Sequence, residues 1–420
     1  MKLKFIKLFN SIILLSFLLF GYSVFADSEF DSWKQEFRNY AIDQGISAQT
    51  VDTAFRGLLP DPEVIENDSY QSEFVKPLWK YLESAISERR LEKAKEMLEK
   101  HRELLDKIEA QYGVQREFIV AIWGVESNFG GNYGNKSIIR SLATLAYQGR
   151  REDFAKKQLL AALRIIDRGD VSPDQMIGSW AGAMGQTQFI PTTYEEYAVD
   201  FDGDGKRNLI QSIPDALAST ANYLSKAGWT NNQAWGQEIK LPKDFDWSLS
   251  DMRTWLSLGC WQHTGVTLYS GDSLLQSFSS DTENASAILL PTGHAGPAFL
   301  VNKNFKVIKR YNNANSYALA VAYLADQMMG RMGILAQWPV DDVMLNRAER
   351  TELQQRLTDN GFDTKGIDGK IGPNSQAAIR AWQKTENLIA DGYINKRLFE
   401  VLKQKLPLKP QPEKSQESSD

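Results

Sequence analysis

The stretch AIWGVESNFGG, residues 121–131, places a glutamate where an apolar side chain is expected. Ile119, Ile122 and Trp123 recur at helical spacing, and Glu126 follows the first of them by seven positions. Since each residue of an α-helix turns by about 100°, Glu126 continues the apolar stripe instead of facing water. The glycines that end the stretch predict that the helix stops within a turn. The pattern therefore predicts a carboxyl group directed inward at the end of a helix.

Two interpretations of this inward carboxyl are open. Burial and the negative end of the helix dipole both disfavour the ionised form of Glu126, so the group can keep a proton near neutral pH. A protonated carboxyl is what general-acid catalysis requires. The alternative is a buried glutamate with a purely structural role.

The chain has 420 residues, enough for two or three domains. Residues 1–26 begin with three lysines, continue through an apolar run and end in small residues. This is the pattern of a secretory signal peptide. No later segment is apolar enough to span a bilayer. We therefore expect an exported protein that is soluble once the leader is removed. An uncleaved leader that serves as an anchor is the alternative.

Charge and cysteine content exclude several classes of protein. The net charge of −5 gives no basic footprint for nucleic acid. The single cysteine, Cys260, excludes an intrachain disulfide and lies far from any terminal lipid-attachment position. We expect this thiol to be buried and inert. The motifs HExxH and GxSxG and the phosphate-binding loop are not found, so we expect no cofactor for the chemistry.

The organisation along the chain indicates a mainly α protein. A first domain, residues 27–340, begins with helical patterns, becomes irregular over 231–310 and ends in a helix near 315–331. Short β-like runs in the irregular part include SAILLP and FKVIKRY. The pattern of residues 343–404 predicts a small, separate helical domain. The tail, residues 405–420, is rich in proline, serine and charge, and we expect it to be disordered.

A cation site is predicted by the loop DFDGDGK. Its first, third, fifth and sixth positions match the opening of an EF-hand calcium loop: Asp200, Asp202, Asp204 and Gly205. Lys206 can add its backbone carbonyl at the seventh position. The twelfth position is Gln211 instead of the usual glutamate, and Asp215 can supply the missing carboxylate. The alternative is a solvated acidic turn without an ion.

Five motifs in order carry a resemblance to a known family: WGVESNFGG, SWAGAMGQTQFIPTTY, DFDGDGKRNL, ALASTANYL and RYNNANSYALAVAYLAD. Together they resemble the membrane-bound lytic transglycosylase B family, whose members cleave the glycan strands of peptidoglycan, over about residues 30–337. Residues 343–404 resemble a short three-helix peptidoglycan-binding domain. The resemblance implies a lysozyme-like helical catalytic domain with a small irregular or β part and a deep glycan groove.

The resemblance also implies roles for individual residues. Glu126 takes the position of the catalytic acid. The implied substrate-binding residues are Arg150, Arg151, Ser179, Gln188, Tyr223, Tyr311, Asn312 and Tyr317. The implied ligands of a structural calcium ion are Asp200, Asp202, Asp204, Lys206 and Asp215.

The chain also departs from the family pattern. It lacks the acylated cysteine of the lipoprotein members, so no lipid anchor is expected. In the stretch GQTQ, Gln186 and Thr187 stand between a glycine and a glutamine where family members often have two aromatic residues. With the leader, the resemblance implies a periplasmic protein, and we expect a monomer whose partner is the glycan strand.

The function expected is that of a lytic murein transglycosylase. Such an enzyme cleaves the MurNAc–GlcNAc β-1,4 bond without water and leaves 1,6-anhydroMurNAc ends, with Glu126 as general acid and then base. A hydrolytic muramidase is the first alternative, but it normally needs a second carboxylate across the glycan. Glu152 and Asp153 are the nearest acids after Glu126, and neither lies in a recognisable motif. The second alternative is a non-catalytic protein that binds peptidoglycan.

Overall fold

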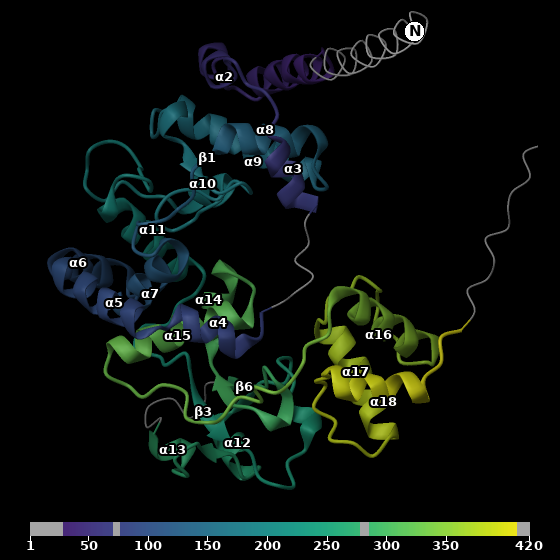
Figure 1. Cartoon of the computed structure of the whole chain (residues 1–420). Helices are drawn as coiled ribbons and strands as arrows, with labels where there is room; N and C mark the ends of the chain where they lie inside the picture. Colours follow the sequence, from purple (N-terminus) through teal and green to yellow (C-terminus); the bar gives the residue numbers. More distant parts are fainter. Residues whose placement is uncertain (1–27, 70–75, 278–284, 410–420) are drawn as a thin grey trace, which may run out of the picture. The chain divides into compact units, whose positions relative to one another are not determined.

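A computed structural model describes residues 28–69, 76–277 and 285–409 of the chain (Figure 1). The expected leader, residues 1–26, lies outside these ranges, and so does the tail beyond residue 409. The described residues form a mainly α structure with two small sheets, which confirms the expected fold class. Across the described ranges, no helix is both long and apolar enough to cross a membrane.

Two compact units make up the described chain, and each combines segments that are distant in the sequence. The first unit contains residues 28–69, 101–112 and 122–223. The second unit contains residues 76–100, 113–121, 224–277 and 285–409. Two helices have residues in both units, namely α7 (Arg116–Ser127) and α11 (Ile213–Lys226).

Helices dominate the first unit. After a helix over residues 28–43, they are α2 (Ala48–Ala54), α3 (Pro62–Ser69), α6 (Arg102–Tyr112), α8 (Ile138–Gln148), α9 (Glu152–Asp167), the 3-10 turn η1 (Pro173–Gln175) and α10 (Pro191–Tyr197). Helix α9 packs against α2, α8 and α10. The short strands β1 (Lys136–Ser137) and β2 (Ile177–Gly178) pair antiparallel. Ser137 then caps α8 by accepting the backbone N–H of Arg140.

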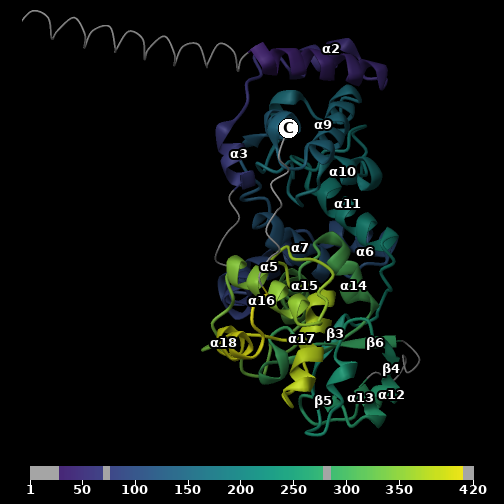
Figure 2. The same cartoon turned by 90° about the vertical axis from the view of Figure 1, so that its right-hand side faces the viewer.

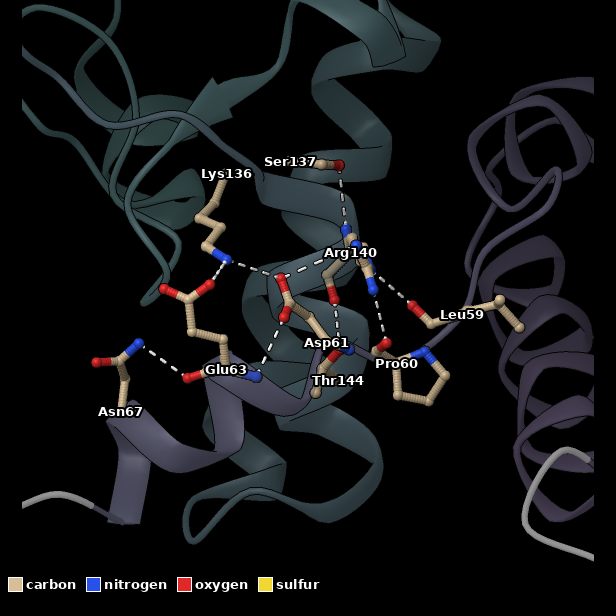
Figure 3. A network of polar contacts seen from close by, with 9 residues as sticks. All are labelled: Leu59, Pro60, Asp61, Glu63, Asn67, Lys136, Ser137, Arg140 and Thr144. Carbon is tan, nitrogen blue, oxygen red and sulfur yellow. Dashed lines mark hydrogen bonds and ion pairs between the residues drawn. The ribbon is translucent and has the colours of Figure 1, made fainter. Parts of the chain in front are cut away.

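A polar network joins the start of α3 to the start of α8 (Figure 3). The backbone N–H of Asp61 donates to Thr144 Oγ1 at 2.9 Å, and its carboxylate lies 3.1 Å from Lys136 Nζ. Lys136 also pairs with Glu63, and Arg140 donates to two carbonyl oxygens just before α3, at 2.9 and 2.8 Å. Burial alone would raise the pKa of Asp61, but Lys136 and Arg140 hold it below its usual value.

A five-stranded antiparallel sheet lies in the second unit, in the order β4-β6-β7-β3-β5. The strands are β3 (Gly236–Lys240), β4 (Leu256–Ser257), β5 (Thr267–Leu268), β6 (Ala285–Leu289) and β7 (Ala298–Val301). The helical segments of this part are η2 (Trp247–Leu249), α12 (Leu258–His263), α13 (Leu274–Ser277) and η3 (Gly293–Ala295). Figure 2 shows α12 and α13 beside the sheet, where Trp261, Ile288 and Leu300 share one apolar core.

Four longer helices complete this part of the second unit: α4 (Leu78–Ala85), α5 (Glu88–Lys100), α14 (Lys303–Tyr311) and α15 (Asn315–Met328). Helix α15 packs against α4, α5 and α14. Ten consecutive residues of α15, from Tyr317 to Asp326, are buried. This helix is therefore central to the packing of the unit.

Two expectations from the sequence are wrong. The run FKVIKRY, expected to be β-like, lies in α14, because Phe305 and Ile308 bury at helical spacing while Lys306 and Lys309 alternate with them. The β-branched residues of this run misled the prediction. Cys260 was expected to be buried, yet it is exposed. Helix α12 buries Leu258 and Trp261 three positions apart, which turns the thiol outward. The strand expected at SAILLP is confirmed as β6.

The C-terminal part of the second unit is a three-helix structure of α16 (Arg347–Asp359), α17 (Pro373–Thr385) and α18 (Lys396–Lys405). Leu353, Leu357, Ile379, Trp382 and Phe399 form its apolar core. Helix α16 begins with a capping box between Asn346 and Glu349.

Two matching polar clasps hold the loops of this three-helix structure. In the first clasp, Gln354 accepts the N–H of Gly369 at 2.7 Å and donates to Asp368 at 3.2 Å. In the second clasp, Gln383 accepts the N–H of Gly392 at 2.8 Å and donates to Asp391 at 3.0 Å. Each clasp joins a helical glutamine to an Asp-Gly turn, so the same solution is used twice. No repeat was apparent in the sequence, because Asp368 follows Gln354 by 14 positions whereas Asp391 follows Gln383 by only 8.

Replacing Asp61 with asparagine tests the polar network. Asp61→Asn should lower the free energy of unfolding by about 1–3 kcal/mol at pH 7, because buried donors lose a charged partner. The folded pKa of Asp61 lies below the unfolded value, so this stabilisation is present above about pH 4 and is lost as the pH falls through the folded pKa. Melting curves of both proteins should therefore converge in acid. The control Asp31→Asn changes an exposed acid paired with Lys34 and should leave the melting temperature unchanged. Equal effects of the two substitutions would contradict the role of Asp61.

Candidate active site

Glu126 is the second-last residue of α7 and is half-buried. Ile119, Ile122 and Trp123, which share its stripe, are at most 1% exposed. The helix ends at Ser127, within the turn expected from the sequence. The stripe is therefore part of the core, and it carries the Glu126 carboxyl to the edge of that core.

The turn that follows Glu126 has an uncommon backbone. Asn128, Phe129 and Gly130 have φ angles of 52°, 60° and 77°, and the left-handed region is costly for a bulky residue such as phenylalanine. The N–H of Phe129 returns to the carbonyl of Trp123 at 3.2 Å. The N–H of Gly130 donates to Ser127 Oγ at 2.8 Å. These bonds hold the turn in one conformation, which fixes the backbone next to Glu126.

Packing of the Phe129 ring explains a glycine inside α7. The ring meets Trp123 edge-to-face, with centroids 5.7 Å apart, and Phe129 is only 9% exposed. It lies directly over Gly124, where an added Cβ would come within 2.7 Å of the ring. A glycine here costs helix propensity, but it lets the turn fold back onto the helix.

A buried glutamine, Gln186, clamps the same turn from the opposite side. Its Oε1 accepts the indole N–H of Trp123 at 3.1 Å, and its amide nitrogen donates to the carbonyl of Ile210 at 3.3 Å. A Cβ on Gly130 would lie 2.6 Å from the same Oε1. The family resemblance implied Gln188 as a site residue and gave no role to Gln186. The available signal was that GQTQ offers two glutamines two positions apart, but only the tertiary structure shows which of them reaches Trp123.

Ser179 and Gln188 shape the loop that contains Gln186. Ser179 Oγ accepts the N–H of Ala183 at 3.0 Å. The amide nitrogen of Gln188 donates to the carbonyls of Tyr133 and Gly185, at 3.0 and 2.9 Å, and its own φ is 53°. The bond to Tyr133 joins this loop to the segment that follows Glu126.

Glycines let these two segments approach closely. A Cβ on Gly134 would lie 2.1 Å from the carbonyl oxygen of Gly178, and a Cβ on Gly178 would lie 2.1 Å from that of Ala183. The run of small residues therefore brings backbone against backbone beside the Glu126 turn.

Tyr223 lies in α11 close to this loop. Its ring packs edge-to-face on Tyr197, with centroids 4.7 Å apart, and is tilted against Phe189 at 5.9 Å. Because Phe189 follows Gln188 directly, the structure brings Tyr223 together with the loop that holds the Glu126 turn.

The two arginines occupy the joint between α8 and α9. The backbone N–H of Arg150 donates to the buried Asp68 at 2.9 Å, and its guanidinium reaches the same carboxylate at 3.4 Å. The Arg151 guanidinium lies over the ring of Phe154, 5.2 Å from its centroid. Their use as substrate contacts stays a prediction.

The remaining three expected substrate residues belong to the second unit, whereas Glu126 belongs to the first. Tyr311 and Tyr317 are stacked with their planes 7° apart and their centroids 6.4 Å apart. Tyr317 is buried, and Asn312, which follows α14, is exposed. Their use as substrate contacts stays a prediction.

The expected cation loop brings three carboxylates together. Asp200, Asp202 and Asp204 are exposed, and each offers one oxygen within 4.8 Å of the others. Asp200 also accepts the N–H groups of Gly203 and Gly205, at 2.7 and 2.9 Å, which curls the loop around its first acid. Clustered oxygen ligands of this kind suit a hard cation such as calcium.

Asp215 supports the same loop from inside. It is fully buried, and its two oxygens accept the N–H groups of Phe201 and Asn208 at 2.8 and 2.7 Å. Burial raises the pKa of Asp215 more than these bonds lower it. Because its two oxygens accept backbone N–H groups from both ends of the loop, Asp215 fixes the conformation of the loop backbone. Lys206 donates its N–H to Asp204 at 2.8 Å. Whether Asp215 and Lys206 are ligands as well stays a prediction.

Comparisons with known proteins agree with this architecture. The family model described as "Transglycosylase SLT domain" matches residues 29–326, and "Putative peptidoglycan binding domain" matches residues 346–402. Membrane-bound lytic murein transglycosylase B of Escherichia coli strain K12 is 35% identical over 216 residues, which are 50% of this chain and 56% of that protein. The chain thus spans about half the length of this curated relative.

Solved structures extend the similarity over more of the chain. SltB3 from Pseudomonas aeruginosa, in complexes with NAG-anhNAM-pentapeptide and with NAG-NAM-pentapeptide, is 51% identical. The TM-score is 0.87, and the match covers 89% of this chain and 99% of that one. The Escherichia coli lytic transglycosylase Slt35 in complex with calcium is 26% identical, with a TM-score of 0.60, over 70% of this chain and 92% of that one.

The fold and the matched families define a lysozyme-like helical lytic transglycosylase, a class of enzyme that acts on peptidoglycan, followed by a peptidoglycan-binding domain. The chain belongs to the transglycosylase SLT domain family, whose model matches residues 29–326. The resemblance found in the sequence is therefore confirmed.

Gly124→Ala tests the packing behind Glu126. Alanine normally stabilises a helix interior by about 0.5–1 kcal/mol relative to glycine. Here its Cβ would strike the confined Phe129 ring, so we expect destabilisation of about 1–3 kcal/mol and at least a tenfold slower cleavage of peptidoglycan. The matched control is Gly259→Ala in α12, whose nearest neighbour would be 4.0 Å away and which should not lower the melting temperature. A Gly124→Ala protein as stable and as active as wild type would refute this explanation.

Proposed function

We propose that the protein is an exported lytic murein transglycosylase that cleaves the MurNAc–GlcNAc β-1,4 bond and leaves 1,6-anhydroMurNAc ends. The observation that carries the proposal is the Glu126 carboxyl, held at the edge of the core by a rigid turn. It is supported by the 51% identity to SltB3, whose structure contains an anhydro sugar.

A single carboxyl group can serve both halves of this reaction. Protonated Glu126 donates its proton to the glycosidic oxygen as the bond from that oxygen to the anomeric carbon breaks. The 6-hydroxyl of the same MurNAc then attacks the anomeric carbon and gives its proton to the ionised Glu126. The carboxyl is regenerated and no water is consumed. An attacking group within the same sugar has a high effective concentration, so no positioned water is needed.

The two acids nearest to Glu126 in the following sequence are both exposed. Glu152 and Asp153 are exposed in the first turn of α9, and Glu152 lies 3.7 Å from Lys156. A hydrolytic muramidase would need a second carboxylate across the glycan. Neither acid has a described contact with the Glu126 turn or lies in a recognisable second-acid motif, so we propose the intramolecular route.

We propose the division of labour expected from the sequence for the rest of the chain. Residues 1–26 direct export to the periplasm, residues 27–340 form the catalytic domain, residues 343–404 bind peptidoglycan, and residues 405–420 are a tail. Within the catalytic domain, a glycan strand would be contacted by Arg150, Arg151, Ser179, Gln188, Tyr223, Tyr311, Asn312 and Tyr317. Hydroxyl, amide and guanidinium groups orient sugars, and aromatic rings stack on them.

We also propose that the loop of Asp200, Asp202 and Asp204 binds a structural calcium ion. Support comes from the clustered oxygens and from the calcium complex of Slt35. The ion would brace the loop and take no part in the reaction, for which the chain needs no cofactor.

Glu126→Gln tests the mechanism. Glutamine keeps the shape but cannot transfer the proton, so cleavage of sacculi should slow by at least about a hundredfold while the melting temperature is retained. Glu152→Gln is the matched control and should retain activity. Mass spectrometry of the wild-type digest should show anhydro ends without oxygen from labelled water. Reducing ends that contain the label would establish a muramidase, and the absence of any cleavage would establish a binding protein.

Calcium titration tests the loop. An ion bound only by the folded protein should raise the melting temperature as calcium is added. Asp202→Ala combined with Asp204→Ala should abolish that rise, since two of the three clustered carboxylates are removed. The control, Asp174→Ala with Asp244→Ala, removes two exposed acids elsewhere and should keep the rise. If calcium did not change the melting temperature of the wild-type protein, the loop would be a solvated acidic turn that binds no ion.

A further inference from the structure

A cavity of about 260 Å³ opens on the C-terminal three-helix domain. Apolar side chains of Met344, Ile371 and Tyr393 line it, together with Arg350 and Gln376, and Pro291 closes one side from the segment after β6. The cavity therefore combines an apolar wall with one cationic group. We call it the α16–α17 pocket.

The guanidinium of Arg350 is held in place without an acidic partner. Its Nε donates to the carbonyl of Gly369 and its Nη1 to that of Leu345, both at 2.7 Å. Among the described residues, no carboxylate forms an ion pair with Arg350. Burial lowers the pKa of Arg350, and the only charged neighbour that contributes is another cation, Arg347. A half-buried cation of this kind favours an anionic ligand.

A second arginine lies where the pocket continues. A smaller cavity of about 80 Å³ shares Pro291, Gln376 and Tyr393 with the α16–α17 pocket, and Arg380 lines it. Arg380 is 8% exposed, and its buried Nε has no hydrogen-bond partner among the described residues. Buried donors normally have partners, so this Nε is a donor that a ligand could satisfy. Asp251 and Asp391 line the same smaller cavity and balance the charge of Arg380, so the cation without a nearby carboxylate is Arg350.

The walls of the pocket are already fixed. The Asp391 carboxylate accepts the N–H groups of His294 and Tyr393, both at 2.9 Å, and also contacts the His294 ring. Gly293 has a φ of 68°, and a Cβ there would come within 2.6 Å of Asp391. The loop after β6 is thus held against the C-terminal domain. Preorganised walls reduce the entropy that binding would cost.

We propose that the α16–α17 pocket binds the peptide stem of peptidoglycan, with a peptide carboxylate on Arg350 and small apolar side chains against Met344 and Ile371. This inference rests on the proposed function, because it names the part of the polymer that the C-terminal domain recognises. A peptide supplies both the carboxylate and the apolar groups that the lining matches, whereas sugar hydroxyls supply neither. The fixed, planar guanidinium suits a carboxylate in two-point contact.

Calorimetric binding of the pentapeptide without sugars to the full chain tests the proposal. The wild-type protein should bind it, and amidation of its carboxylates should weaken binding at least tenfold. Arg350→Gln should have an equal effect. The matched control Arg397→Gln removes an exposed charge from the same domain but outside the pocket, and it should bind as wild type does.

A second variant separates binding from folding. Gln376 is exposed, so Gln376→Glu should leave the melting temperature unchanged while its new carboxylate competes for the arginines and weakens peptide binding severalfold. Three results would each overturn the proposal. They are no binding of the pentapeptide to wild type, equal binding by wild type and Arg350→Gln, and equally tight Arg350-dependent binding of peptide-free NAG-NAM. None of these measurements involves glycan cleavage, so their failure is distinct from the failure of the reaction at Glu126.

Discussion

The indole N–H of Trp123 and the backbone beside Gly130 meet at one buried amide, that of Gln186, and the end of α7 depends on this meeting. A helix that ends in three consecutive left-handed residues is strained, and one of the three is a phenylalanine. The strain persists because the Phe129 ring is confined over Gly124 and the backbone N–H groups of Asn128, Phe129 and Gly130 all donate hydrogen bonds. Strained turns of this kind gather at functional sites, where they hold a reacting group in one place. In the proposed reaction, the group held here is the Glu126 carboxyl.

Buried carboxylates elsewhere in the chain have a different task. Asp215 and Asp391 each accept backbone N–H groups, and Asp61 is held by two cations at the start of α3 and α8. Each of them fixes the loop or helix start around it. A carboxylate whose oxygens already accept backbone N–H groups is not available to transfer a proton to a substrate. Burial alone therefore does not identify a catalytic acid. The distinction comes from what surrounds the carboxyl, which sequence spacing cannot report.

The chain joins two kinds of recognition of one polymer. The proposed reaction uses a single carboxyl and a hydroxyl of the substrate itself, so it requires positioning more than a set of reactive groups. The proposed peptide pocket uses a fixed cation beside apolar side chains. Since a glycan strand carries peptides at intervals, one site would bind the sugars and the other the peptides of the same molecule. Linked sites on one polymer raise the local concentration of each for its ligand.

Much of this protein was determined by the sequence itself. The helical periodicity around Glu126 predicted the helical class and the glutamate on the apolar stripe. The alternating acids predicted the cluster of Asp200, Asp202 and Asp204, whose use as a cation site stays a prediction. They did so because these features depend on spacing within short segments. The exposure of Cys260 and the helical conformation of FKVIKRY depend on which face of each segment packs against the core. The choice of Gln186 over Gln188, the confinement of Phe129 and the unpaired Arg350 depend on contacts between distant segments. Only the tertiary structure decides those, because no local pattern encodes which groups meet.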